Sequence, residues 1–202
     1  MATSGPVTLP RFTGVVLAGG RSSRMGTDKA LLVVDVDGRP LVSRAAQALA
    51  DASAGEVLVI GGDAPALGAL GLDARPDDHP GEGPLGAILT ALRLAGEDLV
   101  MVLACDMPAI DAASVRAIVG ALAAAPEALV AAPLVDDRGQ YLTAAYRRGS
   151  QALLGAAYRA GERAPRRAAA GLTVVEVAGL DPHRLGDVDR PEDLHRYARR
   201  QV

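Results

Sequence analysis

The sequence predicts an α/β fold in which helices cover both faces of a mostly parallel sheet. Short apolar runs alternate along the chain with longer segments of helical periodicity, as in sheets built from successive strand and helix units. Half of the residues are hydrophobic, but the aromatics are only four Tyr and one Phe, so the core must be aliphatic. The 202 residues show no internal repeat and no linker-like change of composition after residue 12. We therefore expect a flexible tail over residues 1–12 and one domain over residues 13–202.

The predicted elements follow in order along the chain. Strands are expected where the apolar runs are short, at residues 14–18, 57–60, 99–104, 128–132, 141–146 and 173–177. Helices are expected in the intervals, at residues 40–50, 84–95, 112–124, 150–160 and 191–199. Ligands bind such sheets at the carboxyl ends of the strands, so the residues that directly follow strands are the first candidates for a site.

Composition excludes several classes of protein. With so few aromatics, the chain has no platforms on which the bases of a nucleic acid could stack. One Cys rules out internal disulfides and Cys-rich zinc sites, and the three His are too far apart in sequence for local metal-ligand spacing. Residues 1–10 are rich in Ser, Thr, Gly and Pro, and no apolar run approaches the length of a membrane span. We expect a cytoplasmic protein that binds neither nucleic acid nor membrane and holds any metal through oxygen.

The turn after the first predicted strand has the composition of a phosphate-binding loop. It carries three glycines, Gly19, Gly20 and Gly26, which let backbone N–H groups approach an anion, and Arg24 and Lys29 add positive charge. Neither the Walker spacing nor G-x-G-x-x-G is present, and an ordinary turn from strand to helix would also use glycines. Lys29 is the only lysine beside 20 arginines. In so Arg-biased a chain, a lysine favours a tight phosphate site that needs a compact ammonium, although chance placement stays open.

Here the residues carry a resemblance to a known family. Leu17-Ala18-Gly19-Gly20, Arg24-Met25-Gly26 and Asp28-Lys29 resemble the signature of the molybdenum cofactor guanylyltransferases and their wider nucleotidyltransferase superfamily. The similarity spans about residues 13–197, through segments 83–88, 104–108, 140–146 and 187–194. It implies a Rossmann-like nucleotidyltransferase fold. It also implies that Leu17, Ala18, Gly19 and Gly20 bind the base and ribose of a nucleotide, that Arg24 and Lys29 bind its phosphates, and that the Gly83-Pro84 turn opens a helix beside it.

Acidic residues after predicted strands are the candidate metal ligands. Asp106 follows the run at residues 99–104 and precedes Met107-Pro108, which suits a carboxylate that points into the ligand crevice and binds Mg²⁺, although a helix N-cap would look the same. The resemblance assigns Asp106 the metal role, and superfamily analogy favours Asp189 as a second contact. Asp187 and Asp189 share one face of an extended backbone, but similar guanylyltransferases often have Asn at both positions. Cys105 reads as a small buried hydrophobe and not as a nucleophile.

One acidic residue predicts which nucleobase the protein prefers. A carboxylate can accept hydrogen bonds from both N1–H and the N2 amino group of guanine, whereas cytosine offers only its N4 amino group. Asp77 stands where the resembling family places such an acid, with Asp78 as the alternative in register. The family often has Asn after the second strand, where this chain has Gly61-Gly62, so the choice of guanine rests on Asp77.

A basic stretch is the candidate site for a second, anionic substrate. Residues 138–167 hold seven arginines and one acid, Glu162. We expect the acceptor to lie against residues 140–167, with Gln140, Arg147 and Arg148 as the first candidates to bind it. For Arg163, Arg166 and Arg167, decoration of a loop near Pro165 stays open as the alternative. The other interpretation is a solvated, solubilising surface.

The resemblance then implies an activity. The expected reaction is Mg²⁺-dependent transfer of GMP from GTP to the terminal phosphate of molybdopterin or the molybdenum cofactor, with Arg24, Lys29 and Asp106 as catalytic residues. Partners from cofactor biosynthesis are also implied. The alternatives are the related cytidylyltransferase, a guanylyltransferase acting on phosphoenolpyruvate or phospholactate, and a nucleotide-binding adaptor without catalysis.

Overall fold

The computed structural model describes residues 9–19, 29–34 and 38–188. Within them, strands form an eight-stranded sheet in the order β3-β2-β1-β4-β7-β5-β6, with β8 paired to β5 off this path. The strands are β1 (Phe12–Leu17), β2 (Glu56–Ile60), β3 (Asp73–Arg75), β4 (Leu99–Ala104), β5 (Val130–Val135), β6 (Arg138–Gly139), β7 (Thr143–Arg147) and β8 (Val174–Val177). The predicted α/β class and mostly parallel sheet are confirmed.

The direction of the strands sets the position of the site. Strands β3, β2, β1 and β4 are parallel neighbours, so their carboxyl ends meet at one edge of the sheet. Strand β7 lies between β4 and β5 and runs antiparallel to both. The register pairs Leu103 of β4 with Thr143 and Leu99 with Arg147, so β7 begins at the carboxyl edge and ends at the opposite edge.

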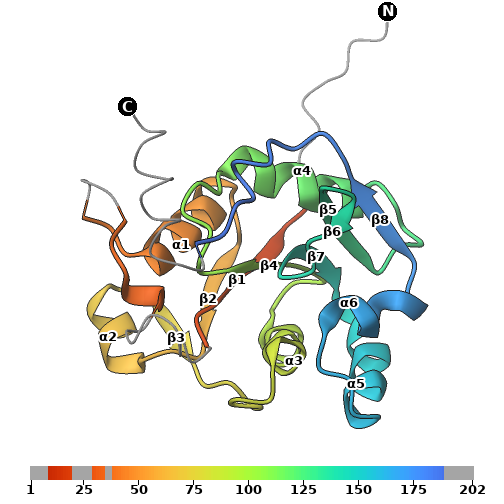
Figure 1. Cartoon of the computed structure of the whole chain (residues 1–202), viewed down its shortest axis with the longest axis horizontal. Helices are drawn as coiled ribbons and strands as arrows, with labels where there is room; N and C mark the ends of the chain where they lie inside the picture. The colour runs from red at the N-terminus through yellow and green to blue at the C-terminus, as the bar shows by residue number, and fades with distance from the viewer. Residues whose placement is uncertain (1–8, 20–28, 35–37, 189–202) are drawn as a thin grey trace, which may run out of the picture.

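Helices cover both faces of the sheet, as Figure 1 shows. They are α1 (Leu41–Asp51), α2 (Ala64–Ala69), α3 (Pro84–Leu94), α4 (Ala112–Ala123), α5 (Gln151–Arg159) and α6 (Pro165–Ala168). Helices α1 and α4 pack on one face, where Leu49 and Ile118 share a cluster with Val16. Helices α3 and α5 pack on the other face, where Ile88 and Leu154 join Val15. No helix of the described ranges combines the length and apolarity needed to cross a membrane.

Local chemistry explains where the helices start. Asp63 and Asp111 cap α2 and α4, because their carboxylates accept hydrogen bonds from the N–H groups of Ala66 (3.1 Å) and Ser114 (2.8 Å). Helix α3 begins with a proline at its first position, after Gly83 with a positive φ of 93°. These side-chain caps and the proline fix the first residue of α2, α3 and α4.

The elements differ from the predicted ones mainly in short segments. Strand β1 starts at Phe12, which the sequence analysis placed in the tail but which is fully buried. Two short strands, β3 and β6, and two short helices, α2 and α6, were not predicted, because such pieces show too few periods of a pattern. The helix predicted at residues 191–199 lies outside the described residues.

Candidate active site

The backbone after three neighbouring strands is joined at the carboxyl edge. The carbonyl of Ile60 accepts hydrogen bonds from the N–H groups of Ala18 (2.9 Å) and Gly19 (3.2 Å), and the carbonyl of Leu17 accepts one from Cys105 (3.2 Å). The turns after β1, β2 and β4 therefore lie side by side. Of the residues predicted to bind the base and ribose, Leu17, Ala18 and Gly19 sit at this edge, and Gly20 lies outside the described part of the chain.

Gly61 is required by this close approach of two turns. It has a positive φ of 77°, and a Cβ atom added to it would lie 2.9 Å from the Cα of Gly19. A side chain at this position would force the turns apart. The resembling family often has Asn after the second strand. At this place the present chain has glycine, whose backbone lies against Gly19.

Lys29 and Asp106 meet at the same edge. Lys29 opens the short 3-10 turn η1 (Lys29–Leu31), and Asp106 follows β4. The Lys29 Nζ donates to Asp106 Oδ2 at 2.7 Å, and the side chains are only 15% and 21% exposed. The main-chain carbonyl of Asp106 also accepts from the N–H of Val188 (2.9 Å), which draws residues 185–188 against the end of β4. The structure thus brings together two residues that are 77 positions apart, with Asp187 nearby; Arg24 and Asp189 are not among the described residues.

A cleft of about 240 Å³ opens beside Asp106. Asp106, Gln140, Arg166 and Asp187 contribute its polar side chains, together with Tyr141 and Thr143 from the approach to β7. Arg166 is exposed and has no carboxylate partner among the residues that the structure describes. Arg166 therefore brings a positive charge to the same cleft that Asp106 lines.

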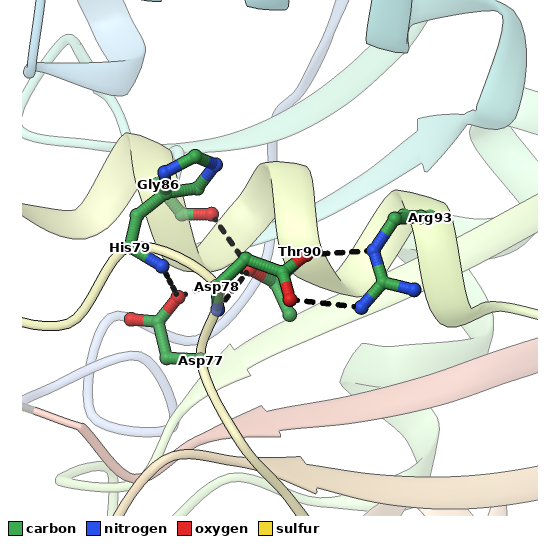
Figure 2. Close-up of polar contacts among 6 residues, drawn as sticks. All are labelled: Asp77, Asp78, His79, Gly86, Thr90 and Arg93. Atoms are coloured by element: carbon green, nitrogen blue, oxygen red, sulfur yellow. Dashed lines mark hydrogen bonds and ion pairs between the residues drawn. The ribbon is translucent and has the colours of Figure 1, made fainter.

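Asp77 and Asp78 are held along α3 in different ways, as Figure 2 shows. Both oxygens of Asp78 pair with Arg93, at 2.6 Å to Nε and 3.0 Å to Nη2. Asp77 uses one oxygen, Oδ1, which accepts from the N–H of His79 (2.9 Å) and from the hydroxyl of Thr90 (3.0 Å). Oδ2 of Asp77 takes no hydrogen bond from the described residues. Of the two acids, Asp77 is therefore the one with an oxygen available to a ligand.

Known proteins identify the family to which these residues belong. A family model described as a MobA-like NTP transferase domain matches residues 14–174, which is most of the chain. The chain belongs to this family. A probable molybdenum cofactor guanylyltransferase of Deinococcus radiodurans is 35% identical over 185 residues, covering 91% of this chain and 92% of the relative. Another, of Chloroflexus aggregans, is 36% identical over 156 residues, covering 75% of this chain and 73% of the relative.

The fold is also similar to that of a solved structure. The crystal structure of molybdopterin-guanine dinucleotide biosynthesis protein A from Archaeoglobus fulgidus superimposes with a TM-score of 0.76 at 21% identity, covering 94% of this chain and 98% of that one. This protein is thus a MobA-like nucleotidyltransferase in family and in fold.

In this MobA-like transferase, the structure corrects the expected roles of Arg147 and Arg148. Arg147 ends β7 opposite Leu99, four residues and about 13 Å along the strand from the carboxyl edge. Its guanidinium donates to the carbonyls of Ala128 (3.0 Å) and Leu122 (3.0 Å) and pairs with Asp98 (3.2 Å). Both arginines therefore lie at the far edge of the sheet, where Arg147 ties backbone together. Of the predicted acceptor residues, only Gln140 lies beside Asp106.

Arg166 is the arginine of the predicted acceptor segment 140–167 that lines the cleft, although the sequence favoured Arg147 and Arg148. Its neighbours Arg163 and Arg167 are engaged by acids: Arg163 pairs with Glu82 (3.2 Å), and Arg167 with Glu162 (2.6 Å). Pro165 was the available signal in the sequence. Proline is favoured at the first position of a helix, so it indicates that Arg166 belongs to a helix and not to a loop. Arg166 thus belongs to a helix and lines the cleft, so the alternative of a loop decoration does not hold for it.

The turn before α6 is fixed by Glu162. Its carboxylate accepts hydrogen bonds from Arg167 and from the N–H groups of Arg163 and Ala164, both at 2.7 Å. The hydrogen bond from Arg167, followed by that from the Ala164 N–H, lowers the pKa of Glu162 to about 2. Arg163 also lies over the ring of Tyr158, 4.0 Å from its centroid, and its main chain contacts the Gly83 turn, where Leu85 donates to the Arg163 carbonyl (3.3 Å). The loop that holds Asp77 is thereby tied to the wall of the cleft that holds Arg166.

Cys105 is buried, as predicted. It is 8% exposed and packs within the aliphatic cluster under α1 and α4. The thiol therefore packs as a small apolar group, in agreement with the expectation that Cys105 is not a nucleophile.

Proposed function

We propose that this MobA-like nucleotidyltransferase transfers GMP from GTP to the terminal phosphate of molybdopterin or of its molybdenum form. The observation that carries the proposal is the Lys29–Asp106 contact of 2.7 Å at the carboxyl edge of the sheet, directly beside the cleft. It joins a cation suited to phosphate with a carboxylate suited to a metal ion. The names of the relatives, molybdenum cofactor guanylyltransferases, support the choice of substrates.

The chemistry requires alignment and charge neutralisation more than proton transfer. A terminal phosphate oxygen of the acceptor attacks the α-phosphorus of GTP, and the bond from that phosphorus to the bridging oxygen breaks as pyrophosphate leaves. The attacking oxygen is already anionic near pH 7, so no general base is needed. Lys29 donates to the phosphates, and Arg24 is proposed for the same task.

The residues present fit Mg²⁺. Asp106 offers a partly exposed carboxylate on the cleft, of which Lys29 holds one oxygen, and the neighbouring acid Asp187 adds only oxygen donors. We propose that Asp106 holds the ion, with Asp189 as the second contact, and that phosphate oxygens complete the coordination. Such an ion supplies charge neutralisation at the transferred phosphate.

The two substrates meet from opposite sides of Asp106. The nucleotide lies along the turns after β1 and β2, with its base toward Asp77 and the Gly83 turn, and the acceptor occupies the cleft with Gln140 and Arg166. A positive side chain on the acceptor wall offsets the repulsion between two anionic substrates. Arg166 replaces Arg147 and Arg148 in this role.

Release of pyrophosphate separates an enzyme from a nucleotide-binding adaptor. The purified protein is incubated with GTP, Mg²⁺ and molybdopterin, and pyrophosphate is measured with a coupled enzyme assay. We expect pyrophosphate to accumulate well beyond one equivalent per protein and to depend on both molybdopterin and Mg²⁺. Binding of GTP with no release of pyrophosphate would instead support the adaptor.

A further inference from the structure

Thr90 is a fully buried polar side chain in an otherwise apolar helix. Eight consecutive residues of α3, 85–92, are buried, and Thr90 is the only one among them with a polar side chain. A buried hydroxyl costs free energy unless it is hydrogen-bonded, and a valine of the same shape would avoid that cost. Packing alone therefore does not explain why a side chain with a hydroxyl stands at position 90.

Two of the three polar contacts of Thr90 lead to the loop that carries Asp77 (Figure 2). Its Oγ1 accepts a hydrogen bond from the main-chain N–H of Asp78 (3.1 Å) and lies 3.0 Å from Asp77 Oδ1 and 3.2 Å from the carbonyl of Gly86. The one hydroxyl proton is thus shared between a carboxylate and the carbonyl four residues earlier in its own helix. Because a charged acceptor forms the stronger hydrogen bond, the carboxylate of Asp77 is the favoured partner.

We propose that Thr90 is a positioning residue that sets the orientation of the Asp77 carboxylate and thereby the preference for guanine. The inference rests on the proposed function. Thr90 and the N–H of His79 both hold Oδ1, so the plane of the carboxylate is fixed while Oδ2 stays available. Guanine presents N1–H and its N2 amino group side by side in one plane, so Oδ2 must lie in that plane to accept from them. A carboxylate free to rotate would keep its charge but lose this alignment.

The neighbouring acid provides a matched control. Arg93, three residues after Thr90 on the same helix, anchors the same loop through Asp78. Removing Arg93 loosens the loop without touching the Asp77 carboxylate. A role in holding the loop and a role in orienting Asp77 can therefore be told apart.

The test compares GTP with ITP, whose base lacks the N2 amino group, and with CTP. Dissociation constants are measured by calorimetry for the parent, Thr90→Val, Thr90→Ser and Arg93→Met, and thermal unfolding verifies that each variant is folded. We expect the parent to bind GTP about tenfold or more tighter than ITP, the scale of one hydrogen bond to a charged group. Thr90→Val should reduce this ratio to below about threefold, and Thr90→Ser should restore it. Arg93→Met should weaken GTP and ITP equally. If Thr90→Val does not fold, Thr90→Ala gives the same comparison.

Two different failures can be distinguished. A parent that prefers CTP to GTP, or binds neither, overturns the proposed function and this inference together. A parent that prefers GTP, with an unchanged ratio in Thr90→Val or an equal fall of the ratio in Arg93→Met, overturns only the role of Thr90.

Discussion

The ammonium of Lys29 and the carboxylate of Asp106 neutralise each other where both are largely withdrawn from water. A buried charge that loses its partner is costly, so this pair is poised to exchange partners when phosphates and a cation arrive. In the proposed reaction, Lys29 contacts the phosphates and Asp106 holds the metal ion. Substitution of each residue alone therefore tests the two proposed roles separately.

We predict that Lys29→Ala and Asp106→Ala each lower the turnover number by about 10²-fold or more, the usual cost of losing one preorganised charge contact. Both proteins should fold, because neither side chain belongs to the aliphatic clusters. Steady-state pyrophosphate release measures the effect. Arg11→Ala, which breaks an ion pair with Glu97 in which Arg11 is 78% exposed, is the control and should leave turnover unchanged. Turnover within about threefold of the parent would remove the substituted residue from the mechanism.

We predict that Cys105→Ala keeps more than about a tenth of the parent activity, because the thiol packs as a small apolar group. Any loss should follow the loss of stability measured by thermal unfolding. A fully folded Cys105→Ala protein with no turnover would restore the thiol to the mechanism.

At the scale of elements, the direction of one strand decides which arginines lie near the cleft beside Asp106. The sequence shows seven arginines in one stretch. Strand β7 runs antiparallel to β4, so Arg147 at its end lies at the edge opposite the cleft, whereas Arg166 of α6 lines the cleft. Periodicity predicts a strand and not its direction, so this separation was not visible in the sequence.

We predict that Arg166→Ala raises the KM for the acceptor about tenfold and leaves the affinity for GTP nearly unchanged, because its guanidinium lines only the acceptor cleft. Raising the salt concentration should weaken acceptor binding in the parent. Arg148→Ala, at the opposite edge, is the matched control and should change neither constant. An equal loss of affinity for both substrates in Arg166→Ala would return the arginine to a solvated surface.

The turn before α6 predicts a pH dependence. The pKa of Glu162, about 2, lies below its usual 4.5, so its contribution to stability is complete above about pH 4.5 and is lost as the pH falls through 2. We therefore expect Glu162→Gln to melt at a lower temperature than the parent near pH 7, with the difference shrinking below pH 4.5. Melting curves from pH 7 to pH 2.5 measure it. A difference that does not change with pH would mean that the charge of Glu162 does not hold this turn.

At the scale of the whole molecule, four parallel strands bring separate turns to one edge. The sequence predicted the class of fold and that Lys29 and Asp106 lie together, because both follow strands whose carboxyl ends must meet. The sequence also singled out Asp77 as the acid expected to bind the base. The structure gives a reason to prefer Asp77 over Asp78, because Asp78 forms an ion pair with Arg93.

The rest of the site depends on tertiary contacts. Arg166 depends on the packing of a four-residue helix, and the hydroxyl of Thr90 resembles any small core side chain until its distance to Asp77 is known. The close contact of Gly61 with Gly19 is likewise visible only in space.

The most direct test of the account is a competition in one reaction. The protein is given equal concentrations of GTP and CTP with Mg²⁺ and molybdopterin, and the products are identified by mass; a parallel reaction replaces molybdopterin with phosphoenolpyruvate or phospholactate. The account predicts the guanine dinucleotide of molybdopterin as the main product, with one pyrophosphate released for each. A cytosine dinucleotide as the main product, or guanylylation of the smaller acceptors in place of molybdopterin, would contradict it.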